Sequence, residues 1–132
     1  MLGYFGPAGT FTHQALRTVT DEEALAFASV REALDAVRSG DVHGAVVPIE
    51  KSGEGGVSAT LDELIAGTPL SIRREIVIPV EFGLYAREGT RIEDVRNVLT
   101  HGHAAAQCRN WLSVTLPEAT VTEAGSTAGA AA

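Results

Sequence analysis

The chain has 132 residues, of which 45% are hydrophobic, and this is enough for a compact globular core. Its 17 acidic and 10 basic residues give a formal net charge of -7, and aromatic residues make up only 5%. This composition argues against nucleic acid as a partner, because nucleic-acid binding needs a basic surface and aromatic side chains that stack on bases.

Two further features bear on where the protein works. No run approaches the ~18 apolar residues of a membrane span, and the N-terminus lacks the pattern of a signal peptide. The single cysteine, Cys108, has no internal disulfide partner, which agrees with a reducing compartment. We therefore expect no membrane partner and a cytoplasmic location.

The first half of the chain repeats a strand–helix pattern. Short apolar runs predict strands at 2–5, 25–28 and 41–50. Apolar residues at helical spacing predict helices at 11–19, 30–39 and 57–66. Thr10 is the predicted N-cap of the first helix, and Ser29 with Glu32 forms a predicted capping box on the second, which Gly40 ends. This order predicts a mostly parallel sheet with helices on its faces.

The stretch from Ile72 to Leu84 alternates apolar and other residues in the manner of a strand. An extended run over 70–86 would span roughly 55 Å at ~3.3 Å per residue, which is too long for one strand of a small domain. We predict a break at Pro79, with the two halves in different sheets. The chain then divides into a first α/β lobe, 1–78, and a second, 79–132, with a hinge near Ile78-Pro79.

The second lobe is predicted to contain a helix capped by Thr90 and Glu93, a strand at 98–101, a helix over the apolar residues 104–112 and a strand at 120–124. Pro117 stops the longer helix. Ser126 looks like the cap of another helix, but only six residues come after it, too few for a stable helix. We expect the chain to be the front part of a longer protein and to stop within its second lobe, at Ala132.

Three places in the chain share one device, in which a strand ends in glycine or hydroxyl-bearing residues before a predicted helix. They are Gly6–Thr10, Lys51–Gly56 and Gly125–Thr127. A helix start has free N–H groups and a partial positive charge, so each place suits an anion. Lys51 adds a full positive charge. Thr10, Ser52 and Ser126 could instead be helix caps alone, each contributing ~1 kcal/mol.

Other chemistry-bearing residues have plainer interpretations. His101 and His103 alternate, as two metal ligands on one strand face would, but no acidic or sulfur partner lies nearby in the sequence. We predict no metal there and a strand end near a cleft instead. Cys108 falls on an apolar helix stripe with Trp111 and is predicted to be a buried structural thiol.

Four motifs occur in order along the chain: Gly3–His13, Val47–Ser52 continuing into Glu54–Val57 and Thr60–Asp62, Gln107–Leu112, and Ser126–Ala128. Together they cover nearly the whole chain, and they resemble the catalytic domain of prephenate dehydratase. Two places depart from the family pattern: Lys51 stands where the family typically has Asn, and Gly102-His103 where it has Pro-Gln.

The resemblance implies a two-lobe fold of the type II periplasmic-binding-protein kind, with the active site in the cleft. It implies conversion of prephenate to phenylpyruvate with loss of CO2 and water, without metal or organic cofactor, in a homo-oligomer, either a dimer or a tetramer. The alternative is a non-catalytic module of the same fold that binds a small carboxylate. Glu50 and Glu54 could act as acid and base, but a carboxylate repels a dianionic substrate unless it is protonated.

The resemblance also bears on individual site residues. The family's catalytic threonine belongs to a Thr-Arg-Phe motif downstream of Ser-Thr-Ala, so we expect it beyond Ala132. Neither that motif nor the regulatory phenylalanine-binding domain occurs in this chain, and we expect the chain alone to be inactive. The catalytic candidates within the chain are Thr10, Ser52 and Thr127. The expected substrate-binding residues are Gly9, Thr10, Phe11, Lys51, Ser52, Gly55, Gly56, Ser126, Thr127 and Ala128.

Overall fold

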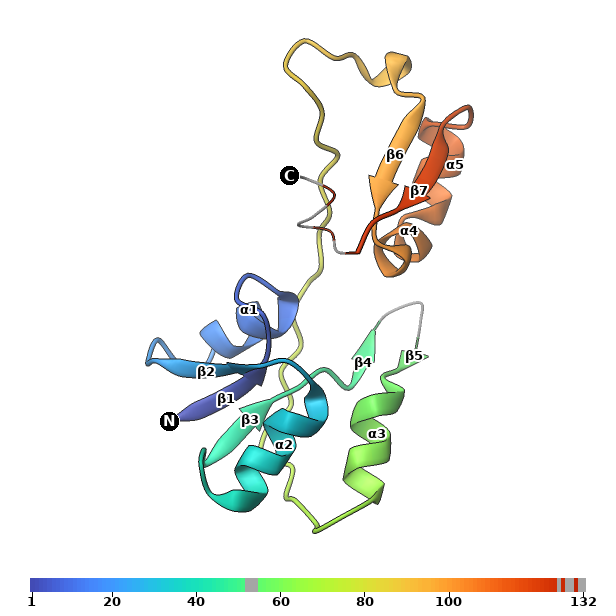
Figure 1. Cartoon of the computed structure of the whole chain (residues 1–132). Helices are drawn as coiled ribbons and strands as arrows, with labels where there is room; N and C mark the ends of the chain where they lie inside the picture. Colours follow the sequence, from blue (N-terminus) through green and yellow to red (C-terminus); the bar gives the residue numbers. More distant parts are fainter. Residues whose placement is uncertain (52–54, 126, 128–129, 131–132) are drawn as a thin grey trace. The chain divides into compact units, whose positions relative to one another are not determined.

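A computed structural model describes residues 1–51, 55–125, 127 and 130. They form two compact units, one made of residues 1–51 and 55–80 and the other beginning at Glu81. Each unit combines helices with a parallel sheet, as expected from the alternation of strand and helix patterns (Figure 1). No helix in the described part of the chain has both the length and the apolar character that crossing a bilayer requires.

The first unit is built on a three-stranded parallel sheet. Its strands are β1 (Leu2–Phe5), β2 (Ala24–Phe27) and β3 (Gly44–Val46), in the order β2-β1-β3. Leu2 of the central strand pairs with Ala24 on one side and Gly44 on the other. The connecting helices α1 (Phe11–Arg17) and α2 (Val30–Ser39) lie on opposite faces of the sheet (Figure 1). The predicted parallel sheet with helices on both faces is therefore confirmed for this unit.

The core of the first unit lies where both helices meet the sheet. Its buried hydrophobic residues include Tyr4, Leu16, Val30, Ala33, Leu34 and Val42. Gly3 lets the Phe27 ring pack closely against the central strand, because a Cβ there would lie 2.6 Å from a ring carbon of Phe27. Val30, Ala33 and Leu34 of α2 are among these buried residues, so the apolar stripe predicted for α2 faces the sheet.

The caps predicted for the first two helices are present. The Thr10 Oγ1 accepts from the His13 N–H at 3.3 Å, and the Ser29 Oγ accepts from the Glu32 N–H at 3.1 Å. The Glu32 carboxylate reaches back to the Ala28 N–H at 3.2 Å, one residue earlier than in a standard capping box. Gly40 ends α2 with a left-handed φ of 86°, a conformation that favours glycine.

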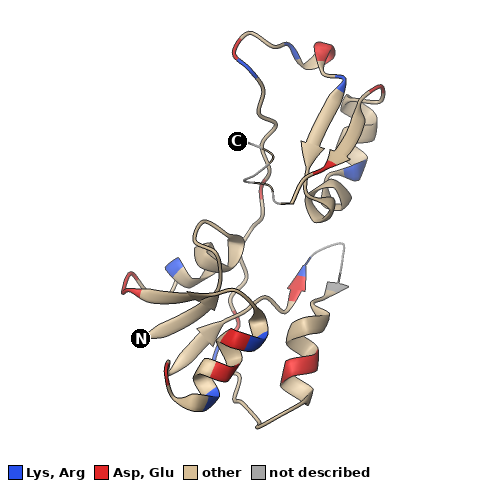
Figure 2. Cartoon of the chain, in the orientation of Figure 1, with Lys and Arg blue, Asp and Glu red and all other residues tan. Residues whose placement is uncertain are grey.

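Arg38 connects α2 to the next helix, α3 (Ser58–Ile65). Its guanidinium contacts the carboxylates of Asp35 at 2.7 Å and Glu63 at 3.1 Å, and it donates to the backbone oxygens of Glu63 at 2.8 Å and Thr68 at 3.1 Å. The two carbonyl contacts lie at the C-terminal end of α3, where carbonyls lack partners within the helix. Figure 2 shows acidic and basic residues along α2 and acidic residues on α3.

Of the single strand predicted over 41–50, only Gly44–Val46 joins the parallel sheet. After β3 ends, β4 (Glu50–Lys51) pairs antiparallel with β5 (Gly55–Gly56), in a separate two-stranded sheet. Pro48 cannot donate to a ladder, and its carbonyl accepts from the buried Thr60 hydroxyl at 2.6 Å. The bend therefore opens into a hairpin, and α3 begins only at Ser58, after Val57, without a side-chain cap. Ser52 lies outside the described residues.

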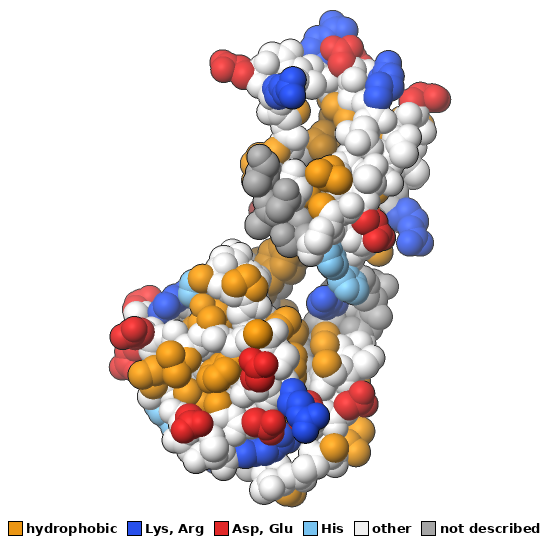
Figure 3. All heavy atoms as spheres, in the orientation of Figure 1, with side chains coloured by type: hydrophobic (Ala, Val, Ile, Leu, Met, Phe, Trp, Pro, Cys, Tyr) orange, Lys and Arg blue, Asp and Glu red, His pale blue; other side chains and the backbone are white. Residues whose placement is uncertain are grey.

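The two half-strands predicted between Ile72 and Leu84 are also absent. Residues 70–87 have no regular secondary structure, and Val77 and Tyr85 are 82% and 78% exposed. Alternating apolar residues favour a β-strand, but a strand forms only where a neighbouring strand can share its backbone hydrogen bonds. Hydrophobic side chains are also exposed on the face of the first unit seen in Figure 3.

The second unit has a two-stranded parallel sheet, β6 (Asn97–Thr100) and β7 (Thr120–Glu123), with α4 (Gly102–Gln107) and α5 (Arg109–Thr115) between them in sequence. Both strands were predicted. The helix expected after Thr90 is only a 3-10 turn at Ile92–Asp94, with Arg91 at its N-cap. The single helix expected over 104–112 is divided at Cys108, and no sequence signal marks that division.

Candidate functional site

The loop after β1 is closely packed and depends on two glycines. The Gly6 N–H donates to the Phe27 carbonyl oxygen at 2.9 Å, and a Cβ on Gly6 would lie 2.9 Å from the Cβ of Ala26. Gly9 has a left-handed φ of 86° with open space around it. The loop therefore needs glycine at position 6 for close approach and at position 9 for its backbone conformation.

Thr10 uses its hydroxyl within this loop. Its Oγ1 donates to the Pro7 carbonyl oxygen at 2.9 Å and accepts from the His13 N–H at 3.3 Å. The cap interpretation of Thr10 is therefore confirmed. Its proton already has an acceptor, so Thr10 could act as a proton donor only after the Pro7 contact breaks; a catalytic role for Thr10 stays a prediction.

The order of the sheet brings two predicted segments to one edge. The chain leaves β1 for β2 on one side and returns to β3 on the other, so the loops after β1 and β3 diverge at the carboxyl edge. Such a switch point is where open α/β sheets bind ligands. The Gly6–Thr10 loop comes after β1, and residues 47–51 come after β3.

Lys51 lies on the hairpin beyond β3. It is half-buried and pairs with Gly55 across β4 and β5, while Glu50 pairs with Gly56. Within the described part of the chain, no carboxylate forms an ion pair with Lys51. A Cβ on Gly56 would lie 2.9 Å from a methyl carbon of Leu61, so glycine there lets the hairpin approach α3. Ser52 and Glu54 lie outside the described residues.

The second unit has its own group of polar residues where β6 and β7 end. His101, Gly102, His103, Glu123 and Ala124 line a cavity of about 350 Å³. A Cβ on Gly102 would lie 2.7 Å from a carboxylate oxygen of Glu123, so this carboxylate rests against the first residue of α4. An anion at this helix start would meet a negative charge.

The third predicted segment, at the end of the chain, is described only in part. Thr127 is exposed. Ser126, Ala128 and Ala132 lie outside the described residues. A role for Thr127 in catalysis or substrate binding, and the position of the family's catalytic threonine beyond Ala132, therefore stay predictions.

The two histidines lie directly after β6, at the start of α4, which agrees with the predicted strand end. The Nδ1 of His101 accepts from the His103 N–H at 3.2 Å, and the two rings stack with centroids 4.9 Å apart. Among the described residues, no group of three or more histidine, cysteine or acidic side chains could hold a metal ion. Cys108 is half-buried, so the expectation of full burial is wrong.

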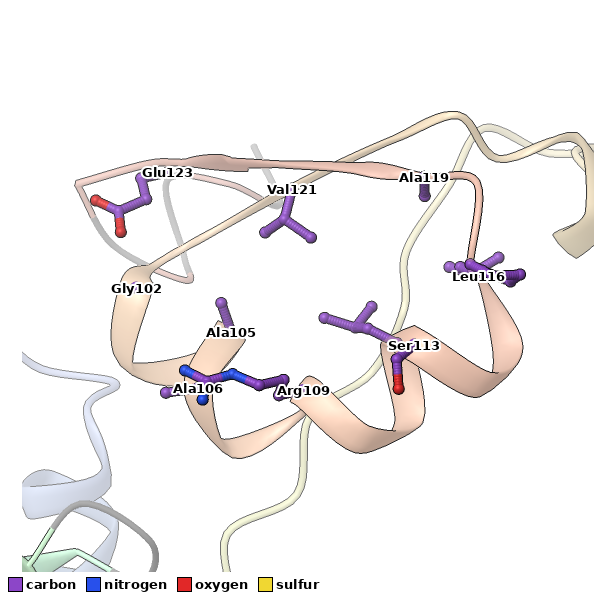
Figure 4. Close-up of a pocket in the computed structure, with 11 residues that line it drawn as sticks. Gly102, Ala105, Ala106, Arg109, Ser113, Leu116, Ala119, Val121 and Glu123 are labelled. Atoms are coloured by element: carbon purple, nitrogen blue, oxygen red, sulfur yellow. The ribbon is translucent and has the colours of Figure 1, made fainter.

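A groove of about 390 Å³ between β7 and the helices α4 and α5 was not predicted. Figure 4 shows Val121 and Ala105 on its two walls, with Arg109, Ser113 and Glu123 as its polar groups. The Ser113 hydroxyl already donates to the Asn110 carbonyl oxygen at 2.9 Å. The small residues Ala105, Ala106 and Ala119 leave this space, and they are the one sequence signal that could have indicated it. None of the predicted site residues lines the groove.

Comparison with known proteins identifies the family. The family description for prephenate dehydratase matches residues 2–132. The chain belongs to the prephenate dehydratase family. A prephenate dehydratase of Amycolatopsis methanolica is 48% identical over 98% of this chain and 43% of its own length. A prephenate dehydratase of Mycobacteroides abscessus is 44% identical over 97% of this chain and 44% of its own length.

A solved structure extends the likeness to the fold. The crystal structure of prephenate dehydratase from Arthrobacter aurescens, in complex with L-Phe, superposes with a TM-score of 0.83 and 44% sequence identity. The match covers 98% of this chain and 44% of the Arthrobacter aurescens chain. This member of the prephenate dehydratase family therefore spans less than half the length of these relatives.

Proposed function

We propose that the protein to which this chain belongs converts prephenate to phenylpyruvate. The observation that carries the proposal is the 48% identity to a named prephenate dehydratase over 98% of the chain, together with the family match over residues 2–132. The chain spans 43% of that relative, so the activity is proposed for the whole protein and not for these 132 residues alone.

The reaction sets the demands on the site. The ring hydroxyl of prephenate takes up a proton and leaves as water, the ring carboxylate leaves as CO2, and the released electron pair completes the aromatic ring. The enzyme must therefore bind carboxylates, hold the ring and supply a proton at the hydroxyl. None of these steps requires a metal or an organic cofactor.

The carboxyl edge of the first sheet supplies groups that suit the first demand. The backbone at Gly9, Thr10 and Phe11 opens α1 after β1, and Lys51 brings a positive charge beyond β3. A carboxylate is favoured by the positive end of a helix and by a cation. We assign substrate binding to these residues and to Ser52, Gly55 and Gly56, and we add Ser126, Thr127 and Ala128 from the second lobe.

The finer architecture is part of the proposal. We propose lobes at 1–78 and 79–132, a hinge near Ile78-Pro79, and the two-lobe periplasmic-binding-protein arrangement, with the substrate between the lobes. The presence of a parallel sheet in each unit is compatible with this arrangement. We further propose a homo-oligomer working in the cytoplasm, with prephenate as the small-molecule partner.

Formation of phenylpyruvate by the full-length protein tests the proposal. Turnover of prephenate without added metal is the expected result. Measurable binding of a dicarboxylate without turnover would instead favour the alternative, a non-catalytic carboxylate-binding module. The 132-residue chain is the informative control: because the threonine proposed to supply the proton is expected beyond Ala132, its rate should be ~10²- to 10⁴-fold lower or undetectable.

A further inference from the structure

His13 lies at the centre of a network that the established family membership does not explain. Its backbone N–H donates to the Thr10 hydroxyl, and its ring stacks on Tyr4 with centroids 4.9 Å apart and planes 19° from parallel. Tyr4 is buried at 4% exposure on the central strand β1. The imidazole of His13 is therefore held in place by the core of the first unit.

Both ring nitrogens of His13 face a hydrogen-bond donor. The Gly9 N–H points at Nδ1 at 3.1 Å, and the Nε–H of Arg17 points at Nε2 at 3.3 Å. A neutral imidazole has one acceptor nitrogen, and an imidazolium has none. His13 can therefore accept from only one of these donors at a time.

Arg17 keeps its position independently of the imidazole. Its terminal nitrogen donates to the Glu22 carbonyl oxygen at 2.7 Å and lies 3.5 Å from the Thr20 carbonyl oxygen. Among the described residues, the titratable or charged side chains in contact with the His13 ring are Arg17 and Tyr4. A proton added to the ring would meet the positive charge of Arg17, and both ring nitrogens would then face donors.

We propose that His13 is a positioning residue for the Gly6–Thr10 loop, holding the Gly9 N–H through Nδ1 only in the neutral tautomer whose proton is on Nε2. Arg17 competes for the same single acceptor, because it favours the other tautomer. Protonation of His13 releases Gly9 completely. The consequence for substrate binding rests on the proposed function, since that function assigns Gly9 and Thr10 to the substrate.

Two substitutions separate the hydrogen bonding of the His13 ring from its stacking on Tyr4. In His13→Asn, the side-chain oxygen can replace Nδ1 as an acceptor but does not titrate. In His13→Phe, an aromatic ring remains to stack on Tyr4 but both acceptors are lost. A third substitution, Arg17→Met, removes the competing donor and leaves the imidazole unchanged.

Nuclear magnetic resonance of the 15N-labelled chain provides the test without needing turnover. We expect the Gly9 amide shift to track the titration of the His13 imidazole in the unmodified chain. Exchange of the Gly9 amide hydrogen should be about threefold to tenfold faster in His13→Phe, as for the loss of one hydrogen bond, and near normal in His13→Asn. Arg17→Met should slow that exchange, and the nitrogen chemical shifts of the His13 ring should then be those of the Nε2–H tautomer.

Several results would overturn the proposal. One is a Gly9 amide chemical shift that does not change as His13 is titrated. Another is equally faster exchange of the Gly9 amide hydrogen in the Asn and Phe variants. A third is an unchanged rate of this exchange in the Phe variant. If the Phe variant does not fold, an unchanged exchange rate and tautomer in Arg17→Met also overturn it. Absence of prephenate turnover would leave these measurements unaffected and would count only against the proposed function.

In the full-length enzyme, the same variants connect the loop to the substrate. KM for prephenate should rise with falling pH as the His13 ring takes up a proton, lose that dependence in His13→Asn, and be raised at every pH in His13→Phe. Turnover with a KM that has the same pH profile in all three proteins would remove the link between His13 and substrate binding.

Discussion

Gly9 and Gly40 have the same backbone conformation, with φ of 86° and open space where a Cβ would be. Each Gly→Ala substitution should therefore destabilise the fold by a similar amount, ~1 kcal/mol, because a side chain is disfavoured in the left-handed region. For a unit of this size this is ~4–8 °C in Tm. Thermal unfolding of both variants gives the comparison.

The two glycines differ in their relation to the proposed site. Gly9 lies in the loop assigned to substrate, whereas Gly40 ends α2. In the full-length enzyme, Gly9→Ala should raise KM for prephenate and Gly40→Ala should not. Equal KM values in the two variants, at equal loss of Tm, would remove Gly9 from the substrate site.

At the scale of elements, Arg38 is the main polar connection between α2 and α3. Its side chain is 14% exposed and contacts Asp35, Glu63 and the carbonyls near the end of α3. Arg38→Ala should lower Tm by several degrees, since it leaves Glu63 and these carbonyls without their donor. Arg38→Lys should recover part of the loss, because lysine keeps the charge but not the planar fork of donors.

Arg31 on the same helix is the matched control. Its side chain is 76% exposed, and its ion pairs with Asp35 and Glu63 are longer, at 3.6 and 3.9 Å. Arg31→Ala should leave Tm nearly unchanged, as exposed pairs contribute little. Equal effects of the two alanine substitutions would mean that Arg38 does not join the helices.

The contribution of Arg38 to folding stability should not vary with pH near neutrality. Hydrogen bonds to Asp35 and then Glu63 raise the pKa of Arg38 above its usual value. A raised pKa means stability that is fully present below the unfolded value and lost only as pH rises through the folded value. Because both values are strongly alkaline, the Tm difference between Arg38 and Arg38→Ala should be the same at pH 6 and pH 8, so far as Arg38's own titration is concerned.

At the scale of the whole molecule, much apolar surface is open to solvent. Ile65, Ile72, Val77, Tyr85 and Val114 are each at least 75% exposed. Exposed apolar side chains favour association, so we expect the 132-residue chain to form dimers or larger species at tens of micromolar. Sedimentation velocity measures this, and a single monomeric species at that concentration would contradict the expectation.

Local signals determined most of the elements. The apolar runs of β1 and β2, the capping residues Thr10 and Ser29, and Gly40 act over a few neighbouring positions, so their effects could be predicted from the sequence. The family motifs likewise identified the protein's relatives, because 48% identity leaves the motifs readable along the chain. The prediction of an anion-binding loop after β1 came from the same local chemistry.

Tertiary structure decided what depends on partners distant in sequence. The alternation at 72–84 produced no strand because the described residues offer it no ladder, and the bend after Lys51 became a hairpin because Glu50 and Lys51 pair with Gly56 and Gly55. The two donors at His13 arise from the Gly9 turn and from the anchoring of Arg17 on the Glu22 carbonyl. Periodicity reports a residue's own preference, whereas hydrogen-bond pairing and burial require a second group whose position only the folded chain supplies.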